Sequence, residues 1–172
     1  MLTGDVKRHP HHVYKREHID VLRAAAIYGA NGAGKSNLIF AISFLRSLAI
    51  GDDILKSHQK FRLSKEHLNK PSELEIELEI NGISYAYGVI FDHKKICKEW
   101  LYVINFDKDD ELIFERETNE DFEHSLKLSE KFLITDKERY FVEFYKEEII
   151  KPTFSFCSSI DQKEKYPRKQ SD

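Results

Sequence analysis

Apolar and charged side chains alternate strictly between Glu73 and Ile80, so one face of this segment is aliphatic and the other carries four glutamates. A period of two residues is typical of a half-buried strand in an antiparallel sheet. The next two residues, Asn81 and Gly82, both tolerate a positive φ, and such a pair is a strong signal for a two-residue hairpin. We therefore predict that residues 83–92 return antiparallel to the first strand.

The alternation continues beyond this hairpin. A polar turn near residues 93–95 precedes a largely apolar segment over 96–106, and a second polar turn precedes a short one over 112–115. Strands that follow one another through short turns predict an antiparallel meander of about four strands at residues 70–117.

The part of the chain after the meander has a weaker pattern. Residues 120–150 mix charged and aromatic positions without a clean period, and we predict helical segments there that end before Pro152. We also predict a short buried strand at residues 153–157.

A different order of elements is predicted near the N-terminus. The apolar run from Arg23 to Tyr28 stops at a glycine, which favours a buried parallel strand with Tyr28 in its core. A glycine-rich turn follows, and then apolar residues recur at helical spacing as far as Ala49, with Gly51 as a natural stop. The order is strand, loop, helix.

Composition narrows the class of protein. The chain has 172 residues, of which 41% are hydrophobic and 12% aromatic, enough for one packed domain. No apolar run reaches the roughly 20 residues that span a bilayer, and the first ten residues lack the apolar stretch of a signal peptide. Cys97 and Cys157 are too few for a disulfide or metal framework and are interpreted as small hydrophobic residues. We expect a cytoplasmic protein without membrane association.

Charge is distributed unevenly. Residues 1–50 hold seven Lys or Arg against three acidic residues, whereas the whole chain has a formal net charge of −3. The basic, His-rich start of the chain favours either a solvated terminus or contact with the phosphates of a nucleotide or nucleic acid. Lys7 and Arg8 are candidates for such a contact.

One motif carries specific chemistry. Residues 29–36, Gly-Ala-Asn-Gly-Ala-Gly-Lys-Ser, match the phosphate-binding pattern G-x-x-x-x-G-K-[ST] in full. The glycines let the backbone form a nest of N–H groups around phosphate oxygens, and the helix that follows adds its positive dipole end. Lys35 is the candidate catalytic residue, reaching the β and γ phosphates, and the Ser36 hydroxyl is the candidate Mg²⁺ ligand. The candidate residues for binding ATP are Gly29, Ala30, Asn31, Gly32, Ala33, Gly34, Lys35, Ser36 and Asn37.

The surroundings of this motif resemble a known family. Residues 27–39 resemble the Walker A segment of ABC-type ATPases, and Asn31 with Asn37-Leu38-Ile39 is typical of the SMC/RecF/OLD-like branch. The segment is also similar to bacterial AAA family ATP-binding proteins, a group that includes the PtuA-like ATPases of Septu and retron anti-phage defence. Residues 81–88 and 98–102 resemble the antiparallel subdomain of that group. The resemblance implies ATP and Mg²⁺ as ligands, a second ATPase head, and an effector nuclease or DNA as partner.

Other motifs of that family are missing. The family has an apolar strand ending in Asp-Glu, a signature loop and a switch histidine, and the sequence shows none of them. Residues 89–92 and 103–107 resemble the Asp-bearing strand. However, the first is followed by His93 instead of an acidic residue, and the apolar run of the second is interrupted by Asn105. Gln162 stands roughly where the family places a glutamine that senses Mg²⁺. We therefore expect the chain to be an N-terminal part of a longer ATPase that binds nucleotide better than it hydrolyses it.

The fold class that these observations predict is α/β, a P-loop NTPase core of ABC type with an inserted antiparallel β-meander. A single partial ATPase head is expected to comprise a basic N-terminal segment (1–22), the strand–loop–helix (23–50), the β-subdomain (70–117), a mixed helical and strand region (118–158) and a tail (159–172).

Two other functions stay open. The chain could be a non-catalytic, nucleotide-dependent interaction module whose catalytic acids are truly absent, or a small P-loop kinase or GTPase, although no base-reading motif or arginine lid is visible. The histidines of the N-terminal segment are candidates for a metal site, but structural zinc sites favour four ligands that include cysteine, and no cysteine is near. These histidines are His9, His11, His12 and His18.

Overall fold

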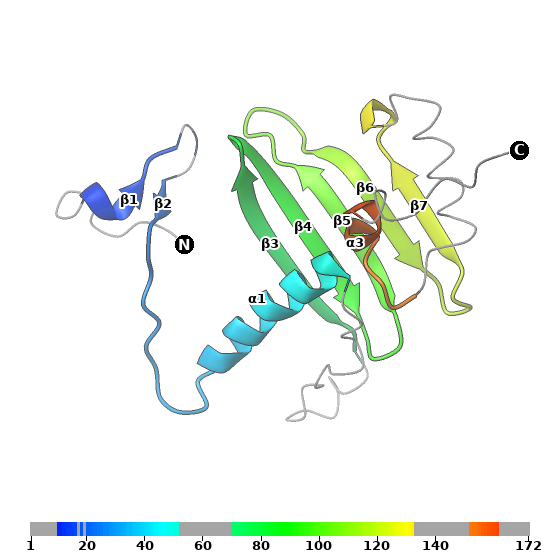
Figure 1. The fold of residues 1–172 in the computed structure, drawn as a ribbon, viewed down its shortest axis with the longest axis horizontal. Coiled ribbons are helices and arrows are strands. Elements are labelled where there is room, and N and C mark those ends of the chain that lie inside the picture. Colours follow the sequence, from blue (N-terminus) through cyan, green and yellow to red (C-terminus); the bar gives the residue numbers. More distant parts are fainter. Residues whose placement is uncertain (1–9, 17, 19, 52–69, 133–151, 162–172) are drawn as a thin grey trace, which may run out of the picture. The chain divides into compact units, whose positions relative to one another are not determined.

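The computed structural model describes residues 10–16, 18, 20–51, 70–132 and 152–161 (Figure 1). Contacts divide the chain into two compact units, Met1–Phe40 and Ala41–Asp172. Helix α1 (Lys35–Ile50) begins in the first unit and ends in the second.

The first unit contains a small hairpin. A single 3₁₀ turn, η1 (Pro10–His12), precedes strand β1 (Val13–Tyr14), which pairs antiparallel with β2 (Val21–Leu22). Residues 24–30 then run to the glycine-rich loop without forming a helix or strand, and all of them are exposed.

The prediction of a buried strand at residues 23–28 is therefore wrong. Tyr28, expected in the core of that strand, is 90% exposed, and Ile27 is 46% exposed. A strand requires a neighbour to pair with, and residues 24–28 belong to neither of the described sheets. The described sheets are both antiparallel, so the predicted parallel core is not seen in them.

The second unit is built on a five-stranded antiparallel sheet in the order β3-β4-β5-β6-β7. Each strand pairs with its neighbour in sequence, so the predicted meander is confirmed and has one strand more than expected. The strands are β3 (Ser72–Ile80), β4 (Ile83–Phe91), β5 (Ile96–Val103), β6 (Glu111–Thr118) and β7 (His124–Leu128).

The turn between β3 and β4 has the predicted conformation. Asn81 and Gly82 have φ values of 52° and 83°, the pair of positive angles that a twisted two-residue hairpin needs. The resulting register pairs Ile80 with Ile83 and continues to Ser72 with Phe91. Because side chains alternate along a strand, this register sends Leu74 and Ile76 to the core face and leaves Glu75 on the other.

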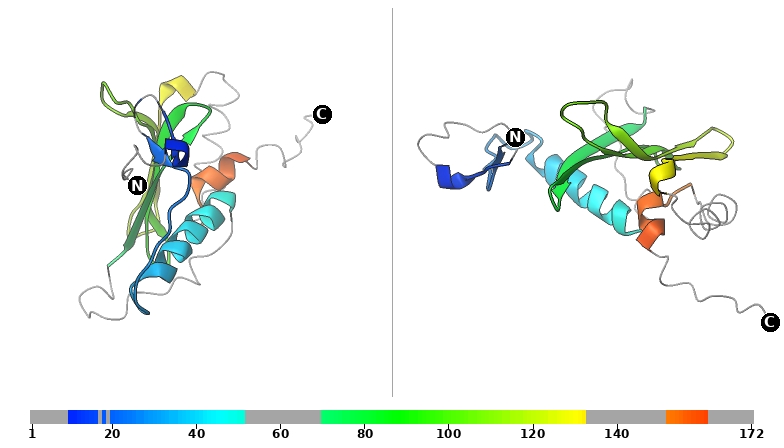
Figure 2. Two further views of the ribbon diagram at one scale, coloured as in Figure 1. Left: turned by 90° about the vertical axis from the view of Figure 1, so that its left-hand side faces the viewer. Right: turned by 90° about the horizontal axis from the view of Figure 1, so that it is seen from above.

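Two helices cover the same face of the sheet (Figure 2). The C-terminal half of α1 contributes Leu45 and Leu48, and Phe44 stacks on Phe91 with ring centroids 4.3 Å apart. Helix α3 (Phe156–Asp161) contributes Phe156, whose ring meets Phe114 edge to face at 4.9 Å. The core therefore joins segments more than 100 residues apart in the sequence.

Trp100 lies on the opposite face of the sheet, directly over Gly88. These residues are paired on β4 and β5, and a Cβ built on Gly88 would lie 2.1 Å from the indole Cζ2. The indole Nε1 donates a hydrogen bond to Glu75 Oε2 at 2.9 Å. Trp100 is 9% exposed, so its indole packs against the sheet.

The structure corrects the predictions for the later part of the chain. Residues 124–128 form strand β7 where helical segments were predicted, and the described residues of that region are helical only in a single 3₁₀ turn, η3 (Glu130–Phe132). The predicted strand at 153–157 is instead a turn leading into helix α3. The rest of the predicted helical region, 133–151, lies outside the described residues, as do Lys7, Arg8, His9 and Gln162.

Candidate functional site

The glycine-rich loop, residues 29–36, bends through two residues with left-handed backbone conformation. Gly32 and Gly34 have φ values of 84° and 86°, which side chains with a Cβ rarely adopt. No atom lies within 4 Å of a Cβ built on either residue, so these positions need glycine for conformation rather than for space. Gly29 differs, because its Cβ would lie 3.2 Å from that of Ala33.

Helix α1 begins directly after this turn. The N–H groups of Asn37 and Leu38 both donate to the Gly34 carbonyl, at 3.0 and 3.3 Å, so Gly34 closes the first turn of the helix. A helix N-terminus carries a partial positive charge and leaves N–H groups without a partner inside the helix.

The Lys35 side chain folds back over the loop. Its Nζ donates to the carbonyls of Gly29 at 2.6 Å and Ala30 at 2.7 Å. The ammonium group is therefore held against the start of the glycine-rich turn, and two of its three N–H donors are used by these two contacts.

Main-chain donors accompany this ammonium group. Within the loop, the Ala33 N–H donates to the Ala30 carbonyl at 3.2 Å. In the described part of the chain, seven further N–H groups of the loop and the helix start have no acceptor: those of Gly29, Ala30, Asn31, Gly32, Gly34, Lys35 and Ser36. Several amide donors, one ammonium group and a helix N-terminus form a set that suits the oxygens of a polyphosphate.

The fit to Mg²⁺ rests on Ser36. This residue is the second of helix α1 and is exposed. A serine at this position of a phosphate-binding loop supplies a hydroxyl oxygen, the type of ligand that Mg²⁺ takes together with phosphate oxygens. The residues present therefore fit a nucleoside triphosphate with its metal ion.

The two segments that resemble an Asp-bearing strand, residues 89–92 and 103–107, have other roles. Asp92 follows β4 and accepts hydrogen bonds from the N–H groups of Lys94 at 2.6 Å and Lys95 at 2.9 Å, so it closes the β4–β5 turn. Asp107 is exposed in the turn after β5. Neither carboxylate stands at the end of a parallel strand.

Three of the candidate metal-ligating histidines, His11, His12 and His18, are among the described residues. His11 and His12 belong to η1 and meet edge to face at 4.3 Å, and His18 is exposed between β1 and β2. The described residues include no group of three or more metal-ligating side chains.

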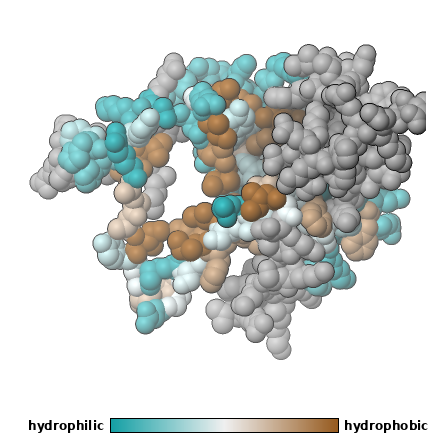
Figure 3. Space-filling view, viewed as in Figure 1, coloured by the Kyte–Doolittle hydropathy of each residue, from teal (hydrophilic) through white to brown (hydrophobic). Residues whose placement is uncertain are grey.

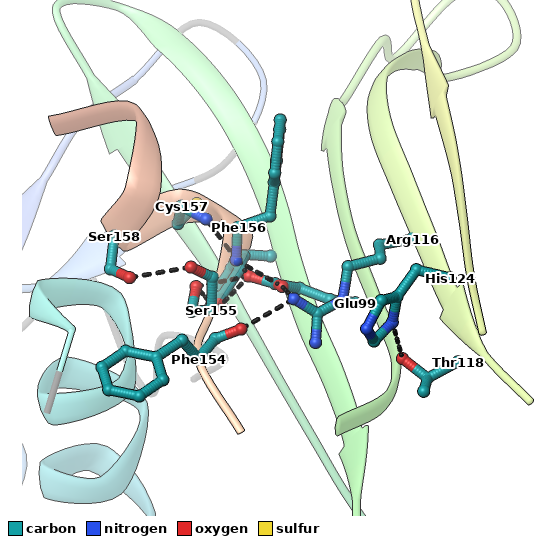
Figure 4. A network of polar contacts seen from close by, with 10 residues as sticks. Glu99, Arg116, Thr118, His124, Phe154, Ser155, Phe156, Cys157 and Ser158 are labelled. Atoms are coloured by element: carbon teal, nitrogen blue, oxygen red, sulfur yellow. Dashed lines mark hydrogen bonds and ion pairs between the residues drawn. The ribbon is translucent and has the colours of Figure 1, made fainter. Parts of the chain in front are cut away.

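A buried polar cluster, which sequence reasoning missed, lies between the sheet and α3 (Figure 4). Glu99 accepts hydrogen bonds from the Tyr87 hydroxyl at 3.0 Å, from the Ser155 hydroxyl and from the Phe156 N–H at 2.8 Å. Arg116 donates to the Phe154 carbonyl at 2.7 Å. An isolated Glu in a strand sequence gives no sign of burial, so only its position two residues before Leu101, on the same face of β5, could have suggested an inward position.

Burial sets the protonation of this cluster. It raises the pKa of the Tyr87 hydroxyl, and the nearby Glu99 charge raises it further. Burial also raises the pKa of the Cys157 thiol and lowers that of Arg116, the latter against the opposing charge of Glu99. These directions keep Tyr87 and Cys157 protonated, which is consistent with a structural role rather than a nucleophilic one.

Comparison with known proteins identifies one family. Residues 24–149 match the family model described as "AAA domain, putative AbiEii toxin, Type IV TA system". No curated protein and no solved structure matches the chain. No helix of the described residues is long and apolar enough to cross a membrane.

Proposed function

The chain belongs to this AAA domain family, whose members have P-loop ATPase-like nucleotide binding, and from that premise we propose that residues 29–37 bind ATP with Mg²⁺. The observation that carries the proposal is the geometry of Lys35, whose ammonium group lies against the glycine-rich turn next to main-chain N–H groups without acceptors.

Each side chain has a distinct part in this proposal. Lys35 contacts the β and γ phosphates, and the ammonium group offsets charge on their oxygens. The N–H groups of the turn hold the phosphates, and the Ser36 hydroxyl ligates Mg²⁺, which when bound bridges phosphate oxygens and neutralises their charge. Asn37 follows on the first turn of α1, within the phosphate-binding segment.

We place the protein among ABC-type ATPases of the SMC/RecF/OLD-like branch that act in the cytoplasm. In this proposal two heads enclose ATP between them, and hydrolysis resets a conformational switch that acts on DNA or on an effector nuclease in anti-phage defence. The support is the sequence of residues 27–39 and the antiparallel meander that follows the P-loop helix.

Exposed apolar side chains around the loop support a larger head. Four large hydrophobic residues in the first half of helix α1 are exposed, and hydrophobic residues are visible along the helix in the space-filling view (Figure 3). Burying such side chains is worth about 1.5–3 kcal/mol each, so a surface of this kind favours coverage by further polypeptide. These residues are Leu38, Ile39, Phe40 and Ile42, with exposures from 44% to 68%.

A non-catalytic, nucleotide-dependent module is the second candidate function. It is favoured by the role of Asp92, which accepts hydrogen bonds within the β4–β5 turn and does not end a parallel strand. In this case ATP binding alone changes the conformation, and no phosphate is released.

Titration of a fluorescent ATP analogue in the presence of Mg²⁺ tests the proposal. A hydrogen bond from a charged group is worth about 1.5–3 kcal/mol, so Lys35→Ala should weaken binding by about 10- to 100-fold. Lys108→Ala, which removes an exposed charge from the turn after β5, is the matched control and should leave affinity unchanged. Equal affinity of wild type and Lys35→Ala would remove the site assignment, and phosphate release separates the two candidate functions.

A further inference from the structure

The hairpin β1–β2 has two chemically different faces. Val13 pairs with Leu22, and Tyr14 pairs with Val21, and the Arg23 N–H extends the ladder by donating to the His12 carbonyl at 2.8 Å. Because successive side chains of a strand point to opposite faces, Val13 and Leu22 share one face. The other face carries Tyr14 and Val21. Arg16 and Arg23 lie just outside the two strands, and their guanidinium groups lie against the Tyr14 ring.

Two guanidinium groups lie over the ring of Tyr14. The Arg16 Cζ is 4.1 Å and the Arg23 Cζ 5.5 Å from the ring centroid, both within the range of a cation–π interaction. Tyr14 is 45% exposed, so this cluster of Tyr14, Arg16 and Arg23, which we call the arginine–tyrosine cluster, is accessible to solvent. Stacking restricts the arginine side chains before any ligand arrives, which lowers the entropy cost of binding one.

The cluster lies in a basic part of an acidic chain. Between residues 10 and 23 the cationic Lys15, Arg16 and Arg23 outnumber the acidic Glu17 and Asp20, and residues 1–50 hold seven Lys or Arg against three acidic residues, whereas the whole chain has a formal net charge of −3. The hairpin is also mainly hydrophilic in the space-filling view (Figure 3). A local concentration of arginine on one small hairpin attracts polyanions at moderate salt.

We propose that the arginine–tyrosine cluster of hairpin β1–β2 binds the phosphodiester backbone of nucleic acid. Arg16 and Arg23 contact backbone phosphates, to which a guanidinium group can donate two hydrogen bonds at once. The exposed edge of Tyr14 contacts sugar or base without reading sequence. This inference goes beyond the nucleotide loop, and neither the surface nor its test depends on ATP binding.

Fluorescence anisotropy with a labelled 30-nucleotide strand and the corresponding duplex tests the proposal in buffers of low and moderate salt. Contacts at exposed sites are worth up to about 1 kcal/mol each, so Arg16→Gln and Arg23→Gln should each weaken binding by about fivefold. Each loss should also make the slope of log affinity against log salt shallower by about one. The comparison of strand and duplex shows which form of nucleic acid the surface prefers.

Lys108→Gln is the matched control, since it removes one exposed positive charge from the second unit. It should leave both the affinity and the salt slope unchanged. The proposal is overturned if wild type binds neither strand nor duplex, or if Lys108→Gln weakens binding as much as the arginine variants. Tyr14→Phe, which retains the ring, should bind as wild type does, whereas Tyr14→Ala should bind more weakly although no charge is lost.

Discussion

Glu99 and Arg116 face each other on strands β5 and β6, with Oε2 of the first 3.9 Å from Nη1 of the second and neither side chain more than 1% exposed. Both also contact the segment that leads into α3, through the Phe156 N–H and the Phe154 carbonyl. The pair therefore links the segment at residues 154–156 to the sheet through hydrogen bonds. Nε and Nη2 of Arg116 have no partner among the described residues, so Glu99 is the main compensation for a buried positive charge.

Replacing Glu99 should destabilise the second unit strongly. Glu99→Ala leaves Arg116 buried without its carboxylate and removes the acceptor of several donors around α3. Removing one partner of a buried ion pair costs about 3–5 kcal/mol. The free energy of unfolding, measured by chemical denaturation, should fall by that amount.

Glu117→Ala is the control for this prediction. Glu117 also pairs with a cation, Lys98 at 3.1 Å, but its side chain is 53% exposed, and exposed pairs contribute no more than about 1 kcal/mol. Similar losses for the two variants would contradict a special role of the buried pair.

Gly88→Ala should be destabilising although alanine is small. The added Cβ would lie 2.1 Å from Trp100 Cζ2, so the indole must move away from its hydrogen bond with Glu75. Overpacking of this kind costs about 1–3 kcal/mol. A double-mutant cycle with Trp100→Leu measures the coupling, and the loss caused by Gly88→Ala should be smaller in the Trp100→Leu background. An equal loss in both backgrounds would show that the indole is not the cause.

Acid should remove a small stabilising contribution of Glu115. Hydrogen bonds from Lys127 and Lys98 lower the pKa of this carboxyl below its ordinary value in the unfolded chain. A lowered folded-state pKa gives stability that is present above the unfolded pKa of about 4.3 and is lost as pH falls through the folded value.

Denaturation at several pH values checks this contribution. Wild type should exceed Glu115→Gln in stability at pH 6 by no more than about 1 kcal/mol, because Lys98 and Lys127 are partly exposed. The difference should shrink below about pH 4. A difference that grows on acidification would have the wrong sign for this ion pair.

Ser36→Ala should make nucleotide binding insensitive to Mg²⁺. In the proposed site the hydroxyl is a metal ligand, whereas the main-chain N–H groups and Lys35 contact phosphates without it. ATP affinity measured with Mg²⁺ and with EDTA should therefore differ in wild type and be nearly equal in the variant. An unchanged Mg²⁺ effect would assign the metal to other residues.

Local patterns predicted the elements that are determined by local interactions. The alternation at Glu73–Ile80 and the turn at Asn81 and Gly82 were sufficient for the first hairpin, because period and turn residues fix both the strands and their register. The glycine-rich loop and the start of α1 followed from the motif in the same way. Whether its residues bind ATP stays a prediction.

Elements that depend on distant partners were not predictable in this way. Phe156 and Cys157 begin a helix whose first N–H groups donate to Glu99, more than 50 positions earlier, and no local pattern records this contact. Conversely, the apolar run before Gly29 has the composition of a buried strand but lacks a pairing partner in the described chain. Strand β7 spans only five residues, too few for a clear period.

Hydrogen exchange of the loop amides tests the central claim most directly, because the claim is that main-chain N–H groups of residues 30–36 hold a triphosphate. Exchange measured by mass spectrometry in peptides covering this segment should slow on addition of ATP and Mg²⁺, and should not slow with adenosine, which lacks phosphates. Peptides from β5 and β6 should be unaffected and serve as an internal reference. Exchange in the loop that ATP leaves unchanged, or that adenosine slows equally, would contradict the account.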